Sequence, residues 1–133
     1  MSALTADRDT PRRDGRDYGF PVAAGVVCHA GAIACLDASG HATPGASATG
    51  LTAVGRFVEH VAGGAEPGAV SVLVETGVFR YVAAEAIDRT AIGADGYIVD
   101  DQTVALSDGG GTRSRAGRIV DVEPLGVWIR IGV

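Results

Sequence analysis

The segment Tyr97-Ile98-Val99-Asp100-Asp101-Gln102-Thr103-Val104-Ala105-Leu106 holds two short apolar runs on either side of an Asp-Asp-Gln triplet. Aspartate favours turns because its side chain hydrogen-bonds to nearby backbone, so this pattern predicts two strands joined by a tight turn. A glycine-rich loop over residues 107–112 follows. Two more strands are predicted over residues 118–122 and 126–131, with Pro124 and Gly126 marking the turn between them.

Composition extends this prediction to the whole chain. The 133 residues include 20 glycines and few aromatic residues, and short Val, Ile and Ala runs recur between the glycines. This length fits one domain, and the pattern favours an all-β barrel or sandwich. A single short helix is expected over Ala83–Ala91, which is alanine-rich and is followed by Gly93 as a C-cap.

Five further strands are predicted upstream, over residues 22–27, 31–37, 51–61, 70–75 and 78–82. Gly55 interrupts the third of them, where a bulge or a close approach of another backbone is expected. Gly77 is expected to turn the chain into the last of them.

The first 17 residues hold four arginines and four aspartates and almost nothing apolar. Such a segment cannot bury enough surface to offset its ordering entropy, so on its own it is expected to be a mobile arm. We therefore divide the chain into an N-terminal arm over residues 1–18 and a β-rich domain over residues 19–133. The arm is either a frayed terminus without function or a segment that orders on a partner through its mixed charges.

In the last strand, Val127, Ile129 and Ile131 point to one face and Trp128 and Arg130 to the other. The aliphatic face is the natural core face. A Trp beside an Arg on the outer face is the composition of interface hot spots. Alternatively, Trp128 closes one open end of the barrel, and the sequence leaves both interpretations open.

Charge limits the classes of partner. The formal net charge is −5, and all eleven basic residues are Arg. An acidic chain without clustered cations argues against nucleic acid as a partner, whereas guanidinium groups suit forked hydrogen bonds to carboxylates at interfaces. No apolar run reaches membrane-spanning length and no signal-peptide core is present, so we expect a soluble, unsecreted chain without a membrane partner.

No motif in the sequence predicts catalysis or cofactor binding. The candidates were the ligand set Cys28, His29, Cys35 and His41, the glycine run 109–111, Ser47, and the pair Asp100 and Asp101. Their spacing does not fit a structural zinc site, a phosphate-binding loop, a nucleophile elbow or an acid–base pair. We therefore expect no catalytic residue, no metal and no cofactor. Cys28 and Cys35 are expected as reduced thiols, although a cross-strand disulfide is geometrically compatible with a turn at Gly31.

The order of these pieces resembles a known family. The motifs that carry the resemblance are YIVDDQTVA (97–105), TRSRAG (112–117), IVDV (119–122) and GVWIRI (126–131). Upstream, they are ADRDTPRRDG (6–15), residues 20–45, GLTAVGRFVEHV (50–61) and VETGVFRY (74–81). Together they resemble the head decoration, or capsid cement, proteins that tailed phages and prophages encode beside the major capsid gene. The resemblance covers nearly the whole chain and rests on turn glycines and strand patterns.

This resemblance implies a tulip-like β-domain with an extended N-terminal arm. It also implies a structural virion protein without enzymatic activity, made in the host cytoplasm and placed on the outer surface of the phage head. Its partners would be the major capsid protein and further copies of itself, as a homotrimer or, alternatively, a homodimer. Each oligomer would bridge neighbouring capsid subunits, so that several modest contacts add up to firm attachment.

Within this role, residues 2–18 would lie along the edge of a capsid strand. The expected capsid contacts of the arm are Arg8, Arg12, Arg13, Arg16 and Tyr18, and the expected oligomer or capsid interface residues are Trp128 and Arg130. Two other classes stay open. A head-displayed module that binds a host surface or glycan predicts exposed aromatic residues on loops, and a small enzyme would depend on His29, His41 and His60.

Overall fold

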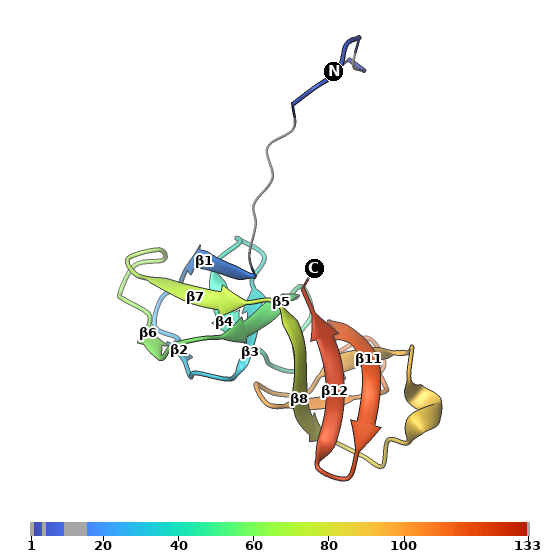
Figure 1. Cartoon of the computed structure of the whole chain (residues 1–133). Helices are drawn as coiled ribbons and strands as arrows, with labels where there is room; N and C mark the ends of the chain where they lie inside the picture. The colour runs from blue at the N-terminus through green and yellow to red at the C-terminus, as the bar shows by residue number, and fades with distance from the viewer. Residues whose placement is uncertain (1, 4, 10–15, 133) are drawn as a thin grey trace.

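The computed structural model describes residues 2–3, 5–9 and 16–132, and within them the chain forms twelve β-strands and one 3₁₀ turn (Figure 1). The strands are β1 (Asp17–Pro21), β2 (Val27–Cys28), β3 (Ile33–Leu36), β4 (Ala42–Pro44), β5 (Thr52–Phe57), β6 (Val61–Ala62), β7 (Ser71–Glu75), β8 (Gly77–Ala83), β9 (Asp95–Ile98), β10 (Thr103–Ala105), β11 (Arg115–Glu123) and β12 (Gly126–Ile131). The 3₁₀ turn η1 covers Arg89–Ala91. The prediction of an all-β fold is confirmed.

The strands form two main bodies. The first is a five-stranded antiparallel sheet in the order β1-β7-β5-β3-β4, with β2 and β6 forming a small separate pair. The second is a closed barrel in the order β10-β8-β12-β11-β9, in which only β8 and β10 run parallel. Only Thr76 separates β7 from β8, so the chain passes from the sheet into the barrel where a turn at Gly77 was expected.

Two apolar clusters stabilise these bodies. One fills the barrel around Ile98, Ile119 and Ile129 and also includes Ile33 and Cys35 from β3 of the five-stranded sheet. The other lies against that sheet and includes Phe57 and Val74. Burying a side chain such as Val, Ile or Phe contributes about 1.5–3 kcal/mol. Because β3 contributes to the barrel's cluster, the two bodies share part of one core.

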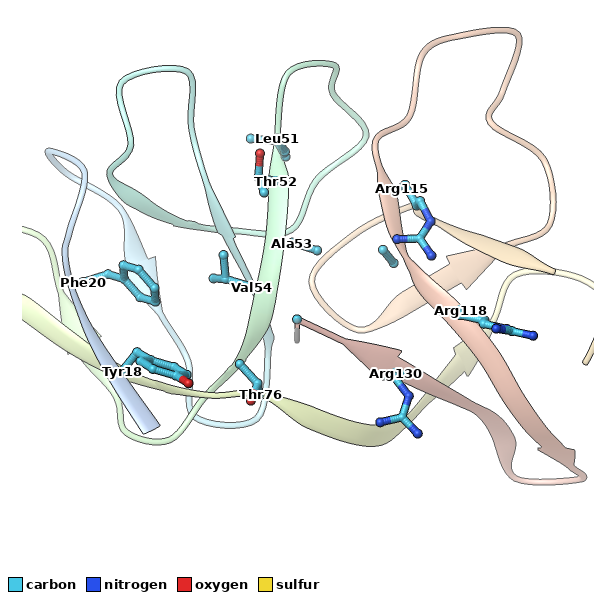
Figure 2. Close-up of a pocket in the computed structure, with 12 residues that line it drawn as sticks. Tyr18, Phe20, Leu51, Thr52, Ala53, Val54, Thr76, Arg115, Arg118 and Arg130 are labelled. Carbon is cyan, nitrogen blue, oxygen red and sulfur yellow. The ribbon is translucent and has the colours of Figure 1, made fainter. Parts of the chain in front are cut away.

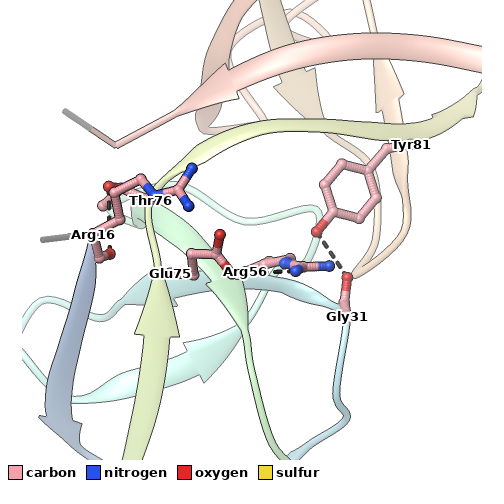
Figure 3. Close-up of polar contacts among 6 residues, drawn as sticks. All are labelled: Arg16, Gly31, Arg56, Glu75, Thr76 and Tyr81. Atoms are coloured by element: carbon pink, nitrogen blue, oxygen red, sulfur yellow. Dashed lines mark hydrogen bonds and ion pairs between the residues drawn. The ribbon is translucent and has the colours of Figure 1, made fainter.

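Hydrogen bonds also join the two bodies. The Tyr81 hydroxyl on β8 donates to the Gly31 carbonyl oxygen at 2.7 Å (Figure 3). The Ser114 hydroxyl donates to the Ala48 carbonyl oxygen at 2.7 Å and accepts from the Leu51 amide at 3.1 Å. These groups are partly buried, so losing one partner leaves the other unsatisfied.

Replacing Tyr81 with Phe is therefore expected to lower the free energy of unfolding by about 1 kcal/mol, because the partly buried hydrogen bond to the Gly31 carbonyl oxygen is lost while the ring packing is kept. Urea unfolding measures this loss. Tyr97→Phe is the control, because Tyr97 is a half-buried tyrosine of the same barrel and its hydroxyl has no hydrogen bond in the described part of the chain. Equal midpoints for the two variants would contradict the Tyr81–Gly31 contact.

Two predicted elements are wrong. The helix expected over Ala83–Ala91 is replaced by the end of β8, an irregular segment and the short turn η1. The Ala84 amide donates to the Val104 carbonyl oxygen, so pairing toward β10 overrides the helix propensity of a segment too short to form a helix alone. The strand expected over residues 22–27 is also wrong, because β1 ends at Pro21 and β2 begins at Val27.

Other predicted features are confirmed. The Asp100–Gln102 turn joins β9 to β10, with Val104 opposite Ile98, and the Gln102 amide donates to Asp100 Oδ1 at 2.9 Å. Gly55 has φ of 152°, and a Cβ there would lie 2.1 Å from the Glu75 carbonyl oxygen, so the expected close approach is present. A register shift in the β3–β5 pairing adjoins it.

Candidate functional site

A groove of about 830 Å³ lies between the five-stranded sheet and the barrel (Figure 2). Its lining comes from β1, β5, β11, β12 and the segments next to them. The lining residues are Tyr18, Phe20, Leu51, Thr52, Ala53, Val54, Thr76, Arg115, Ala116, Arg118, Arg130 and Gly132. Segments that are distant in sequence therefore build a single surface.

One wall of the groove is aromatic and aliphatic. Tyr18 and Phe20 occupy alternate positions of β1, opposite Val74 and Val72 of β7. Alternate residues of a strand point to the same face, so both rings lie on one side of the sheet, and both are half-buried. Val54 of β5 adds aliphatic surface beside them (Figure 2). This wall offers partly exposed apolar area to a partner.

The opposite wall carries three arginines on β11 and β12 (Figure 2). Arg118 and Arg130 are exposed and lie directly opposite each other in the β11–β12 register. Arg115 Nε donates to Asp95 Oδ1 at 2.7 Å. Among the described residues, neither Arg118 nor Arg130 has an ion-pair partner. Like charges directly opposite on neighbouring strands are destabilising, so this wall has positive charge that the fold itself does not neutralise.

A β-bulge places Arg115 and Arg118 on the same wall. They are three residues apart, so regular alternation would point them to opposite faces. The β11–β9 register shifts between Arg115 and Gly117, and the two residues between the arginines, Ala116 and Gly117, are both buried. The extra residue in the bulge restores a common direction for the two arginines.

The base of the N-terminal segment lies at this groove. The Thr76 amide, next to the groove, donates to the Arg16 carbonyl oxygen at 2.9 Å (Figure 3). Strand β1 starts at Asp17, so the expected arm boundary at residue 18 falls within β1 and Tyr18 belongs to the sheet. Arg8 is exposed and outside regular secondary structure, and Arg12 and Arg13 lie outside the described residues.

The structure thus brings together two residues that were predicted for different surfaces. Tyr18, expected in the arm, and Arg130, expected at an interface, line the same groove. Trp128 lies elsewhere, half-buried on the outer face of β12 between the buried residues Val127 and Ile129. The Arg80 guanidinium carbon lies 5.8 Å from the centre of the Trp128 ring, and Arg80 pairs with Glu123 at 2.6 Å. Trp128 therefore packs on the side of the barrel.

Sequence reasoning missed Phe20, Arg115 and Arg118 as groove residues. Phe20 falls between Gly19 and Pro21, a context that is typical of a turn. The odd spacing of Arg115 and Arg118 gave no reason to place them on one face. The Ala116-Gly117 pair was the available signal, because a glycine inside a strand often marks a bulge.

The two cysteines lie apart from the groove and apart from each other. Both are free and buried, Cys28 opposite Val61 and Cys35 opposite Thr43, and they belong to different apolar clusters. Burial raises the pKa of both thiols, that of Cys35 to about 12. Both thiols are therefore protonated near neutral pH. The cross-strand disulfide weighed from the sequence is not formed.

In the described part of the chain, no three His, Cys, Asp or Glu side chains are grouped so that they could hold a metal ion. The described residues also include no helix of the length and apolarity needed to span a bilayer. No family model matches this chain, and neither the comparison with curated proteins nor that with solved structures finds a match.

Proposed function

We propose that this chain is a structural virion protein that decorates the head of a tailed phage or prophage-derived particle. The observation that carries this proposal is the groove, which is lined by an apolar wall and by two arginines without an ion-pair partner in the described part of the chain, beside the base of the N-terminal segment. A surface of this kind suits binding to another protein, because guanidinium groups form forked hydrogen bonds to carboxylates and aromatic side chains supply buried contact area. The family resemblance noted from the sequence supplies the partner, the major capsid protein.

In this role the protein stabilises the shell by bridging neighbouring capsid subunits, and it requires no catalysis. Copies of the chain associate, as a homotrimer in the favoured form, so that each oligomer contacts several subunits. Linking weak contacts in one particle raises the effective concentration of the second contact, and the overall attachment is much tighter than any single contact. Ordering of the N-terminal segment on the shell would cost part of this binding energy.

Co-sedimentation with empty heads, assembled from the major capsid protein of the same phage or prophage, tests the proposal. We expect the full-length chain to sediment with the heads and a variant lacking residues 2–15 to be retained at least about tenfold less well, because it loses the arginine-rich contacts. The deletion stops at residue 15 because the Arg16 carbonyl oxygen accepts from Thr76 and β1 begins at Asp17.

The matched control is a chain of unchanged length in which Arg8, Arg12 and Arg13 are replaced by Ser. This variant keeps the main chain of the arm and removes three of its positive charges, so it shows whether the charge or the main chain of the arm is responsible for retention. Equal retention of the deletion variant and the full-length chain would remove the arm from the mechanism. No sedimentation of the full-length chain would overturn the proposed function.

A further inference from the structure

We propose that the groove between β1 and the β11–β12 hairpin binds an extended acidic segment of a partner protein, in which carboxylate and apolar side chains alternate. The inference deepens the proposed function, since it names the chemistry of the capsid segment that would occupy the groove. It stands on the two walls of the groove and on the uncompensated charge of one of them.

The charge on the β11–β12 wall favours an acidic occupant. Arg118 and Arg130 are opposite each other in the β11–β12 register, and no described carboxylate pairs with either. Asp95, which is opposite Arg118 in the β9–β11 register, is already paired with Arg115. A carboxylate placed between the two guanidinium groups would remove their mutual repulsion and accept charge-assisted hydrogen bonds from both.

The two walls together indicate an extended occupant. Tyr18 and Phe20 present apolar surface on one side, and the arginines lie along the other (Figure 2). Successive side chains of an extended chain point in opposite directions, and residues two apart on one side are roughly 6.6 Å from each other. An extended segment lying along the groove would therefore direct its apolar side chains to Tyr18 and Phe20 and its carboxylates to Arg118 and Arg130.

The charge distribution favours a protein carboxylate over a nucleic acid phosphate. The chain as a whole carries a net charge of −5, and only two of the three groove arginines lack a partner in the described part of the chain. Binding to a nucleic acid backbone draws its strength from many neutralised phosphates at once. About two carboxylates are enough to neutralise the two groove arginines that lack a partner.

Binding of a short fluorescein-labelled peptide of alternating Glu and Val, followed by fluorescence polarisation, tests this inference on the full-length chain. We expect saturable binding that weakens about tenfold when Glu is replaced by Gln in the peptide, and by a similar factor in the Arg118→Ser/Arg130→Ser double variant, because two charge-assisted pairs are lost. Arg89→Ser is the control, because Arg89 is an exposed arginine of the turn η1 that pairs with Asp121 and does not line the groove.

Several outcomes would overturn the inference. They are equal binding of the Gln and Glu peptides, an unchanged affinity in the double variant, an equal loss in Arg89→Ser, and absence of saturable binding up to about 1 mM peptide. Tighter binding of oligothymidylate than of the Glu peptide would assign the groove to nucleic acid. The comparison of Gln with Glu peptide uses the unaltered protein, so it can overturn the inference even if the double variant fails to fold.

The peptide-binding and co-sedimentation experiments distinguish an error in the groove proposal from an error in the proposed function. If the double variant sediments with heads as well as the unaltered chain does, the groove is not the capsid contact and the decoration role stands. If the unaltered chain binds the Glu peptide with the expected dependence on Arg118 and Arg130 but does not sediment with heads, the groove is correct and the decoration role fails.

Discussion

Replacing Gly117 with Ala is expected to lower the free energy of unfolding by about 3 kcal/mol, because the new methyl group has no space. A Cβ at this position would lie 2.0 Å from the Arg130 carbonyl oxygen and 2.9 Å from its carbonyl carbon. Both are backbone atoms of β12, so no side-chain rotation can relieve the contact. The β11–β12 pair must separate locally or the bulge must change its register.

Urea unfolding measures this effect as a shift of the midpoint at constant m-value. Gly19→Ala is the matched control: it is also a glycine within a strand, and a Cβ there would meet no atom within 4 Å. We expect this control to change stability by no more than about 0.5 kcal/mol. If Gly117→Ala shifts the urea midpoint as little as Gly19→Ala does, β12 does not approach β11 as closely as the structure places it.

The Gly117 substitution also tests how the groove is built, since the bulge at Gly117 is what turns Arg115 and Arg118 to the same side. If Ala is accommodated by a change of register, one of these arginines leaves the groove wall. The folded fraction of Gly117→Ala is then expected to bind the acidic peptide more weakly than Gly19→Ala does. Stability and binding are therefore coupled at this position.

Local patterns predicted the C-terminal part of the fold well. Alternation over residues 126–131 identified the core face of β12, and Asp100-Asp101-Gln102 identified the turn between β9 and β10. These features depend on side-chain period and turn chemistry, which are properties of the sequence itself. Upstream, the pattern failed at β1, because Asp17–Pro21 contains Gly19 and ends in Pro21. Proline is tolerated there because β1 is an edge strand.

The expected helix failed for a different reason. Helix propensity over Ala83–Ala91 is real but weak, and strand pairing of β8 with β10 and β12 outweighs it. Such pairing joins residues distant in sequence, and a single sequence does not reveal it. The groove has the same origin, since it exists only where the sheet that starts at β1 meets the barrel that ends at β12.

Alkaline pH is expected to unfold this protein at lower urea concentrations, and Cys35 should account for much of the effect. The thiol lies fully buried in the barrel's apolar cluster, and burial raises its pKa from 9.0 to about 12. Above pH 9 the unfolded chain releases this proton while the folded chain keeps it. The unfolded state then binds fewer protons, so the free energy of unfolding falls as pH rises, by at most about 1.4 kcal/mol per pH unit for this group.

The contribution is fully present well below pH 9, and by pH 10.5 the total loss from Cys35 reaches about 2 kcal/mol. Cys28 and Tyr81, whose pKa values burial also raises, add to the slope. Cys35→Ala is expected to flatten the pH dependence by close to one proton. Val104→Ala is the control, because it truncates another fully buried side chain of the same cluster and keeps the thiol. It should lower stability at every pH and leave the slope unchanged. An unchanged slope in Cys35→Ala would mean that the Cys35 thiol ionises in the folded protein near its ordinary pKa, and hence that water reaches the barrel interior.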